Sequence, residues 1–451
     1  MTDDGATFTD HQTEHESEQP ADLPVLTVVH HPNRAFLGAR YVLRDGEAVV
    51  FGRGAPPFGA GVLDDSRMSR RHVQVARTGP DVQVTDLGSH NGTFVNGERI
   101  TNRMLVIGDA LAFGGVILLL HYGPVFHDQP HHPTIVGVGA GIARVISQIH
   151  RAAPLEVTVL IQGETGVGKE LVARALHDAS GRRGAFVPVN CGGLSEGVLH
   201  SEIFGHERGA FSGAGAARGG LVEAARGGTL LLDEIGDASP SLQASLLRLL
   251  EGGEYRAVGS DRVLRSDARI VAATNVPLRH AVEQQRFRQD LHGRLDRFVI
   301  HVPPLRDRRE DILPLATHFA ALMGGADVSV SRPLALAMVA HDWPQNVREL
   351  HAVVEQALIE AGGTGALKLT DAMAARLRPT AAAAPAAAGP APSAPRRDGP
   401  PPRPTAEQLQ ARLAALGGNI KALASELGIA RTTLYRWLKA ANIDPDAHRR
   451  G

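Results

Sequence analysis

The sequence predicts three folded parts of different class: an all-β sandwich, an α/β domain with a parallel sheet, and an all-α helix-turn-helix domain. Three observations support this division. Short apolar runs separated by turns fill residues 23–123, apolar runs alternate with helical patterns over residues 134–378, and a helix–turn–helix pattern occupies residues 405–445. A chain of 451 residues is long enough for about three domains.

The composition argues against a membrane protein and excludes an internal disulfide. No apolar run approaches the roughly 18 residues that a membrane span needs, and residues 1–22 lack the basic and apolar regions of a signal peptide. Cys191 is the single cysteine. We therefore expect a cytoplasmic protein with no membrane contact.

Charge is unevenly distributed, although the net charge is only −1. Residues 1–22 carry seven Asp or Glu and no Lys or Arg, which is typical of a disordered acidic leader. Residues 396–451 carry ten Lys or Arg against five Asp or Glu, a net charge of +5. A basic end of this kind is a candidate for nucleic-acid binding.

Residues 157–180 contain the pattern of a phosphate-binding loop. A buried strand is predicted at Val157–Ile161, and a helix follows Lys169. Between them stands G-x-x-x-x-G-K, whose glycines let backbone N–H groups surround phosphate oxygens while Lys169 reaches the β and γ phosphates. The alternative is a flexible glycine loop. Glu170 stands where Ser or Thr usually contacts Mg²⁺.

A second apolar strand, Thr229–Leu232, ends in two acidic residues. Acids at the carboxyl end of a parallel strand lie beside the nucleotide. We expect Asp233 to hold Mg²⁺ through water and Glu234 to orient and polarise the attacking water. Further strands of the same sheet are predicted at Phe186–Val189, Ile270–Ala273 and Phe298–Val302.

Two further stretches resemble the sigma-54-dependent bacterial enhancer-binding proteins, a branch of the AAA+ ATPases. Gly209-Ala210-Phe211-Ser212-Gly213-Ala214 is similar to the family's GAFTGA loop, which contacts the sigma factor, with Ser212 in place of Thr. An exposed Phe211 is unfavourable in a generic surface loop unless it inserts into a partner. The second stretch, Phe287–Leu295 followed by Pro303–Ile312, also matches the family. The resemblance covers residues 134–378 and implies an α/β core at 134–303 below a helical lid at 304–378.

The resemblance also implies individual roles. Arg288 and Arg294 would be arginine fingers that reach the γ-phosphate in a neighbouring subunit, although surface arginines in ion pairs are the plainer alternative. Asn190 matches the residue that restrains the catalytic Glu234. Thr274-Asn275 match the first sensor, and Gln345 replaces a Gly that usually precedes the second-sensor helix. The implied cofactors are ATP and Mg²⁺, and the implied ATP-binding residues are Gly163, Glu164, Thr165, Gly166, Val167, Gly168, Lys169, Glu170, Asp233, Asn275 and Arg348.

The turns of residues 23–123 include Gly52-Arg53, Ser69-Arg70-Arg71-His72 and the run from Asp86 to Gly97. In this order they resemble the turns of the forkhead-associated (FHA) domain. The resemblance implies that Arg53, Ser69 and Arg70 contact the phosphate of a phosphothreonine peptide and that Asn91 holds the peptide backbone. We expect His72 to pack beneath the loop. A sandwich that binds no phosphate is the alternative.

Two linkers and a terminal domain complete the chain. Gly123–Pro133 is predicted to be a linker whose histidines face solvent, and residues 379–404, rich in Ala and Pro, a semi-rigid one. Residues 405–445 resemble a Fis-type DNA-binding domain, with a basic three-helix interaction module as the alternative. The residues expected to face DNA are Arg431, Thr432, Thr433, Arg436 and Lys439.

Together these parts predict a bacterial transcription activator. By resemblance, it binds upstream promoter DNA, assembles from a dimer into a ring that is expected to be a hexamer, hydrolyses ATP and remodels sigma-54 RNA polymerase. The FHA part would read a phosphothreonine protein from a Ser/Thr kinase pathway. Two alternatives stay open: a AAA+ ATPase that remodels a different protein, and a DNA-bound phosphoprotein scaffold.

Overall fold

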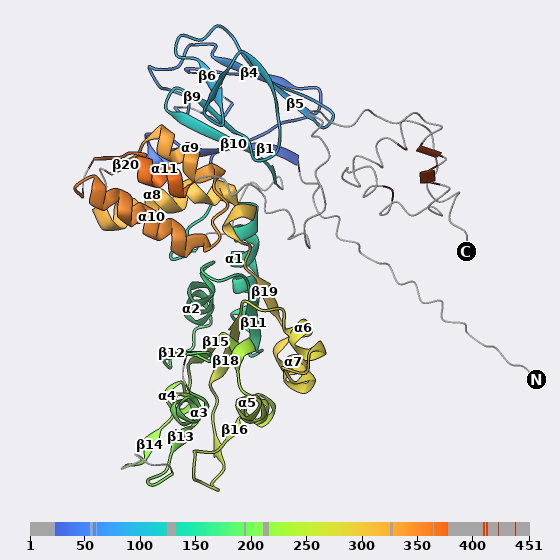
Figure 1. Ribbon diagram of the computed structural model, residues 1–451, viewed down its shortest axis with the longest axis vertical. Coiled ribbons are helices and arrows are strands. Elements are labelled where there is room, and N and C mark those ends of the chain that lie inside the picture. The colour runs from blue at the N-terminus through green and yellow to red at the C-terminus, as the bar shows by residue number, and fades with distance from the viewer. Residues whose placement is uncertain are drawn as a thin grey trace, which may run out of the picture. The chain divides into compact units, whose positions relative to one another are not determined.

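The computed structural model in Figure 1 describes residues 23–54, 57–59, 61–123, 132–193, 195–210, 216–324, 328–363, 365–377, 409–410, 412–413, 423 and 438. The chain divides into two compact units, Met1–Ala381 and Ala382–Gly451. Every helix and strand whose bounds follow lies in the first unit. None of the described helices is both long enough and apolar enough to cross a membrane.

The first part of the chain is a β-sandwich of two antiparallel sheets, as predicted. One sheet has the order β2-β1-β10-β9-β6-β7 and the other the order β3-β4-β5-β8. A 3₁₀ turn, Arg34–Phe36, follows β1. The strands are β1 (Leu23–His30), β2 (Arg40–Val42), β3 (Ala48–Phe51), β4 (Val73–Thr78), β5 (Asp81–Asp86), β6 (Thr93–Val95), β7 (Glu98–Ile100), β8 (Asn102–Leu105), β9 (Ala110–Phe113) and β10 (Val116–Gly123).

A five-stranded parallel sheet forms the α/β core, in the order β12-β15-β18-β11-β19. Its strands are β11 (Val159–Gln162), β12 (Phe186–Asn190), β15 (Thr229–Asp233), β18 (Arg269–Thr274) and β19 (Val299–His301). The predicted strands are all present, and β11 begins at Val159 instead of Val157. The helices of the core are α1 (Ala140–Ala152), α2 (Lys169–Ala179), α3 (Glu196–Phe204), α4 (Leu221–Ala224), α5 (Pro240–Gly252), α6 (Leu278–Glu283) and α7 (Gln289–Leu295).

Successive residues of β15 separate the two faces of this sheet. Leu231 packs with the apolar residues of α1 and α2, whereas Leu230 and Leu232 pack with those of α3 to α7. Both faces of the sheet are therefore buried, which explains why its strands are continuous apolar runs in the sequence. The smaller elements are β13 (Gly205–His206), β14 (Arg218–Gly219), β16 (Glu254–Tyr255), β17 (Leu264–Arg265) and the 3₁₀ turn Ile235–Asp237.

A helical lid follows the core, as the resemblance implied. Fully buried Trp343 lies in its interior and donates its indole N–H to the carbonyl oxygen of Met338 at 2.9 Å. Two 3₁₀ turns, Leu305–Asp307 and Arg309–Asp311, lead into the lid. Its elements are α8 (Ile312–Gly324), β20 (Ser329–Val330), α9 (Arg332–Ala340), α10 (Asn346–Glu360), β21 (Ala366–Leu367) and α11 (Asp371–Arg376).

Strand β10 joins the sandwich to the lid. Leu118 packs in the sandwich interior, whereas the next residue, Leu119, packs on the opposite face with buried residues of α8 and α9. Val29 of β1 and Ala112 of β9 lie in the same cluster as Leu119. Figure 1 shows these lid helices against β1 and β10. The outer face of this sheet is thus a core shared with the lid.

The prediction that the linker histidines face solvent is wrong for His132. Its side chain is buried, at 7% exposure, and its Nδ1 lies 3.0 Å from the hydroxyl oxygen of Thr134. Its ring stands 6.3 Å from that of His150 in α1. Residues 124–131 lie outside the described residues. A polar residue in a Pro-rich run gives no sign of burial when the element that covers it comes later in the chain.

Leu119→Ala is expected to destabilise both the sandwich and the lid. Truncating a buried Leu costs about 2–5 kcal/mol, and Leu119 contributes to the core shared by β10 and the lid. We expect faster amide hydrogen exchange in both β10 and α8. Leu118→Ala is the matched control, since it should speed exchange in the sandwich without reaching α8; equal effects of the two variants on α8 would contradict the shared core.

Candidate active site

The phosphate-binding loop connects β11 to α2 and requires glycine at two positions. Gly166 and Gly168 have φ angles of 79° and 101°, in the left-handed region that favours glycine. A Cβ atom on Gly166 would lie under 3.0 Å from the carbonyl oxygen of Gln345 in the lid. The backbone conformation therefore favours glycine at both positions, and at Gly166 the close contact with the lid requires it as well.

Lys169 and Asp233 place opposite charges beside this loop. Lys169 is buried, and its Nζ donates to the carbonyl oxygens of Gly163 at 3.0 Å and Glu164 at 3.2 Å. Burial lowers the pKa of Lys169 and raises the pKa of Asp233 at the end of β15. A desolvated ammonium can exchange these carbonyls for phosphate oxygens, and a desolvated carboxylate gains from a metal ion. The residues present fit a nucleotide with its divalent cation.

Asn190 and Glu234 meet at the ends of two adjacent strands. The side-chain Nδ2 of Asn190 donates to Oε2 of Glu234 at 2.9 Å, and the backbone N–H of Gly192 donates to Oδ1 of Asn190 at 2.7 Å. The second bond fixes the amide so that its NH₂ group faces the carboxylate. Glu234 has a φ of 55°, which is uncommon for a residue other than glycine and frequent at functional sites.

Asn275 follows β18, which lies between β15 and β11. Its Nδ2 donates to the hydroxyl oxygen of Thr165 at 3.0 Å. The neighbouring Thr274 is buried and bonds the backbone at Val276 instead. The sheet therefore brings three predicted groups to one edge: the phosphate-binding loop, the two acids and Asn275.

The lid contacts this loop through a residue that the sequence analysis missed. Asn346 is fully buried at the start of α10, and its Nδ2 donates to the carbonyl oxygen of Thr165 at 3.0 Å and to Oε2 of Glu164 at 3.2 Å. Its Oδ1 accepts from the N–H of Leu305 at 2.7 Å. Arg306 forms an ion pair with Glu164 and donates a hydrogen bond to its carboxylate. That hydrogen bond is the main cause of the lowered pKa of Glu164. The sequence signal that could have identified Asn346 was its place within the stretch that resembles the second-sensor helix.

The backbone of Arg348 lies beside the phosphate-binding loop. The backbone N–H groups of Val347 and Arg348 donate to the carbonyl oxygen of Gly166 at 3.0 and 3.3 Å. Gln345 has a φ of −104°, so the glycine that is usual there is not needed for a left-handed backbone. Helix α10 begins directly after Gln345.

A buried charged cluster connects the same loop to the sandwich. Arg308 is buried and donates to the carbonyl oxygen of Val167 at 3.2 Å. Asp311, also buried, lies 3.8 Å from Arg308 and accepts from the backbone N–H groups of Val138 and Gly139. Arg40 of β2 donates to the carbonyl oxygen of Val138. Polar contacts thus run from a sandwich strand to the phosphate-binding loop.

Arg288 and Arg294 lie away from the phosphate-binding loop and the two acids. Arg288 directly precedes α7, and Arg294 lies within that helix. Arg288 forms a salt bridge with Asp290 at 2.6 Å, and Arg294 forms one with Glu251 at 3.1 Å. These four residues border an open hollow of about 790 Å³. Both arginine side chains are nearly half exposed, at 47% and 43%.

The predicted phosphopeptide residues gather on neighbouring loops of the sandwich. Arg53, Arg70 and Asn91 are exposed. The N–H of Arg53 donates to the carbonyl oxygen of Ser69 at 3.0 Å, and the hydroxyl oxygen of Ser69 accepts from the N–H of His90 at 3.2 Å. These bonds hold the three loops together.

His72 packs beneath these loops, as predicted. It is fully buried, and its Nδ1 accepts from the N–H of Ser69 at 3.1 Å. Its Nε2 therefore carries the proton and donates to the carbonyl oxygen of Gly92 at 3.2 Å. At Gly52 a Cβ atom would lie under 3.0 Å from the carbonyl oxygen of Arg70, so only glycine fits there.

Part of the predicted sites lies outside the described residues. Gly209 and Ala210 are described, whereas Phe211, Ser212, Gly213 and Ala214 are not. The residues predicted to face DNA are also outside the described residues: Arg431, Thr432, Thr433, Arg436 and Lys439.

Four family models match the chain in order. Residues 36–114 match the FHA domain, residues 135–301 the sigma-54 interaction domain, residues 306–388 the AAA+ ATPase lid domain, and residues 406–440 the bacterial regulatory protein, Fis family. The transcriptional regulatory protein ZraR of Escherichia coli is 42% identical over 306 residues, which cover 66% of this chain and 67% of ZraR. The chain belongs to the sigma-54-dependent transcriptional activators.

Two further proteins are similar to part of this chain. The Nif-specific regulatory protein of Azospirillum brasilense is 45% identical over 238 residues, which cover 50% of this chain but only 37% of that protein. The crystal structure of NtrX from Brucella abortus in complex with ATP has 28% sequence identity, covers 70% of this chain and 71% of NtrX, and gives a TM-score of 0.49. By the four matching family models, the activator carries a AAA+ ATPase domain, an FHA domain and a Fis-type helix-turn-helix domain.

Asn346→Ala is expected to weaken nucleotide binding at least tenfold. The change leaves the buried N–H of Leu305 and the carbonyl of Thr165 without their partners, at a cost of about 1–3 kcal/mol for each group. The dissociation constant of a fluorescent ATP analogue measures the effect. Gln345→Gly is the matched control and should change this constant less than twofold; an unaltered constant in Asn346→Ala would rule out the lid contact as a support of the loop.

Proposed function

We propose that this activator binds DNA upstream of a promoter, hydrolyses ATP as a ring oligomer and remodels sigma-54 RNA polymerase to open the promoter. Binding of a phosphothreonine peptide to the FHA domain gates this activity. The observation that carries the proposal is the Asn190–Glu234 hydrogen bond of 2.9 Å beside the phosphate-binding loop. It supports a catalytic carboxylate held in a restrained state. Such a protein acts in the cytoplasm, where its DNA and polymerase are found.

The chain's residues divide the hydrolytic work among them. Bound ATP with Mg²⁺ would supply the phosphoryl group that is transferred to water. The loop amides and Lys169 would bind the phosphate oxygens, Asp233 would hold the metal through water, and Glu234 would orient the attacking water. Asn190 restrains Glu234 until it releases the carboxylate. Glu170, which replaces the usual hydroxyl residue, leaves the metal to Asp233.

Subunit boundaries complete the site. Arg288 and Arg294 are exposed on α7 and lie in ion pairs with acids of their own subunit. In a ring, these guanidinium groups leave their acids and stabilise negative charge on the γ-phosphate of the neighbour. Hydrolysis then depends on assembly. The dimer expected on DNA would be the starting unit for the hexamer.

Two rival functions are separated from the proposal by particular residues. A motor that remodels another protein would keep the ATPase residues and lose the contact between residues 209–214 and sigma-54. A DNA-bound scaffold would need neither Lys169 nor Glu234. Membership of the sigma-54-dependent activators and the assembled loop, acids and Asn190 favour the proposal over both.

Phe211→Ala is expected to abolish promoter opening while ATP turnover stays within about twofold of wild type. The side chain belongs to the loop that contacts sigma-54, not to the nucleotide site. Open complexes formed by purified sigma-54 polymerase on a promoter with its upstream site provide the measurement, with ATP turnover as the control. ATP turnover without opening by the wild-type protein, even with phosphothreonine peptides present, would favour the rival motor.

Mixing two inactive variants tests the arginine in trans. Arg294→Ala and Glu234→Gln alone should each lower ATP turnover by about 100-fold or more. In an equal mixture about a quarter of the boundaries join an intact Glu234 to an intact Arg294, so up to about a quarter of wild-type turnover should return. A mixture that is no more active than its components would place Arg294 outside catalysis.

A further inference from the structure

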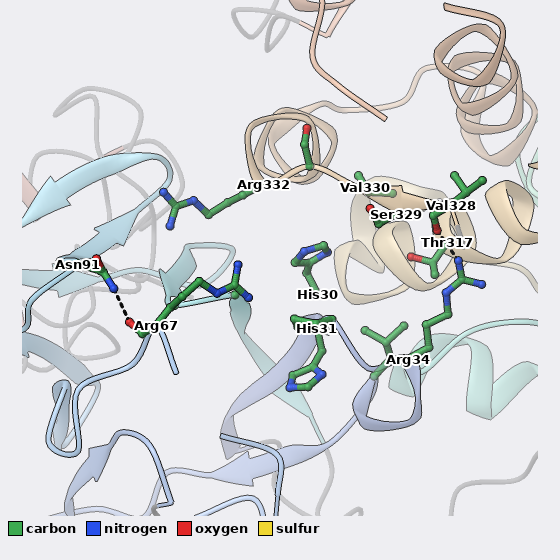
Figure 2. A pocket seen from close by; sticks show the side chains of 15 residues that line it. His30, His31, Arg34, Arg67, Asn91, Thr317, Val328, Ser329, Val330 and Arg332 are labelled. Carbon is green, nitrogen blue, oxygen red and sulfur yellow. Dashed lines mark hydrogen bonds between the residues drawn. The ribbon is translucent and has the colours of Figure 1, made fainter. Parts of the chain in front are cut away.

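A cavity of about 770 Å³ lies between the sandwich and the lid (Figure 2). The sandwich side is formed by the end of β1, the turn after it and three further loops, and the lid side by Thr317 of α8, β20 and the start of α9. Among the residues that the structure describes, its lining contains three arginines, two histidines and no Asp or Glu. The basic and amide residues among them are His30, His31, Arg34, Arg67, Asn91 and Arg332.

The arginines of the two walls face the same space. Figure 2 shows Arg67 extending from a sandwich loop and Arg332 extending from the start of α9 toward the sandwich. Arg332 is exposed, and its guanidinium stacks on the ring of Phe94 at 4.7 Å. Arg67 pairs with Asp65 at 2.8 Å yet keeps 57% of its side chain exposed. Both groups can therefore reach an anionic ligand.

The other polar residues of the cavity, such as His30 and Ser331, contribute hydrogen-bonding groups and not charge. Burial, together with His31 and Arg67, lowers the pKa of His30 to about 4, so His30 is neutral at pH 7. The hydroxyl of Ser331, which precedes α9, is buried without a hydrogen-bond partner among the described residues and does not cap the helix. Buried hydroxyls normally have a partner, and a carboxylate would supply one.

The cavity adjoins the phosphopeptide loops. Asn91 lines it, and its Nδ2 donates to the carbonyl oxygen of Arg67 at 2.7 Å, as the dashed line in Figure 2 marks. A peptide whose backbone is held at Asn91 would therefore pass its flanking residues into the cavity. Acidic flanking residues would suit the lining, since the arginines of both walls attract them.

We propose that the cavity binds an acidic peptide and that its occupant is residues 1–22 of the same chain. This segment carries seven acids and no Lys or Arg, and it joins β1 at Leu23. Strand β1 is eight residues long, about 26 Å, with His30 of the cavity at its far end. A stretch of 22 residues can extend to about 70 Å, which is more than the return along β1 requires.

This occupant would connect the two domains. Acidic side chains paired with Arg67 on one wall and Arg332 on the other hold the lid against the sandwich. Thr7, Thr9 and Thr13 lie among the acids of the segment, so a phosphothreonine formed there would reach Arg53 and Ser69 while its neighbours stay in the cavity. The inference rests on the FHA domain as the regulatory part of the proposed function.

The test uses the full chain with the seven acids of residues 1–22 changed to Asn or Gln. The chain's own segment then no longer competes with an added peptide for the cavity. A dye-labelled, unphosphorylated peptide of residues 1–22 is added, and fluorescence anisotropy is followed at low and high salt. We expect saturable binding that weakens at high salt. Arg332→Glu should weaken binding at least tenfold, and Arg332→Gln less. The matched control on the lid, Arg376→Glu, should change it less than twofold.

Each result decides the inference. No binding at either salt concentration, or equal binding by the Arg332→Glu and Arg376→Glu variants, would overturn it. A second peptide, phosphorylated at Thr13, distinguishes this failure from failure of the proposed function. If only the phosphorylated peptide binds, and Arg53→Ala but not Arg332→Glu abolishes that binding, the FHA domain reads phosphothreonine and the cavity is not the leader's site. Thermal unfolding of each variant checks that it is folded.

Discussion

The contact between Gly166 and the start of α10 is the constraint on which the rest of the site depends. The carbonyl of Gly166 accepts two N–H groups from the lid, and no side chain fits between them. Asn346 adds three hydrogen bonds to the same junction. A phosphate-binding loop held in this way cannot change shape without moving the lid, so binding at the loop and the position of the lid are one equilibrium.

The same junction continues into the sandwich by two routes. Arg308, Asp311 and the backbone at Val138 lead through buried polar contacts to Arg40 of β2. The apolar cluster that contains Leu119 is the second route, because β10 and the lid share it. Chains of packed side chains and buried polar contacts such as these can carry energetic coupling between the sandwich and the ATPase domain. The proposed phosphopeptide gate would therefore act on the lid rather than directly on Glu234.

The local features of the fold could be predicted from the sequence, and the contacts between distant residues could not. Apolar runs placed the strands β12, β15, β18 and β19, and motif resemblance placed Asn190 opposite Glu234, a contact found at 2.9 Å. Asn346, by contrast, acts on residues about 180 positions earlier, and the basic cavity combines residues of β1 with residues of α9. His132 was mistaken for a surface residue for the same reason. Periodicity records which face of an element is apolar, not which later element covers it.

The two-faced burial of β10 also limits how this chain could have been assembled in evolution. A sandwich whose outer face is polar can be joined to or removed from a motor by recombination at a linker. Here Leu119 and its neighbours belong to the lid as much as to the sandwich, so a sandwich taken from elsewhere would leave the apolar surface of α8 and α9 exposed. Exchange of this domain would therefore need compensating changes on both sides of the junction, and the sandwich and lid are expected to be inherited together.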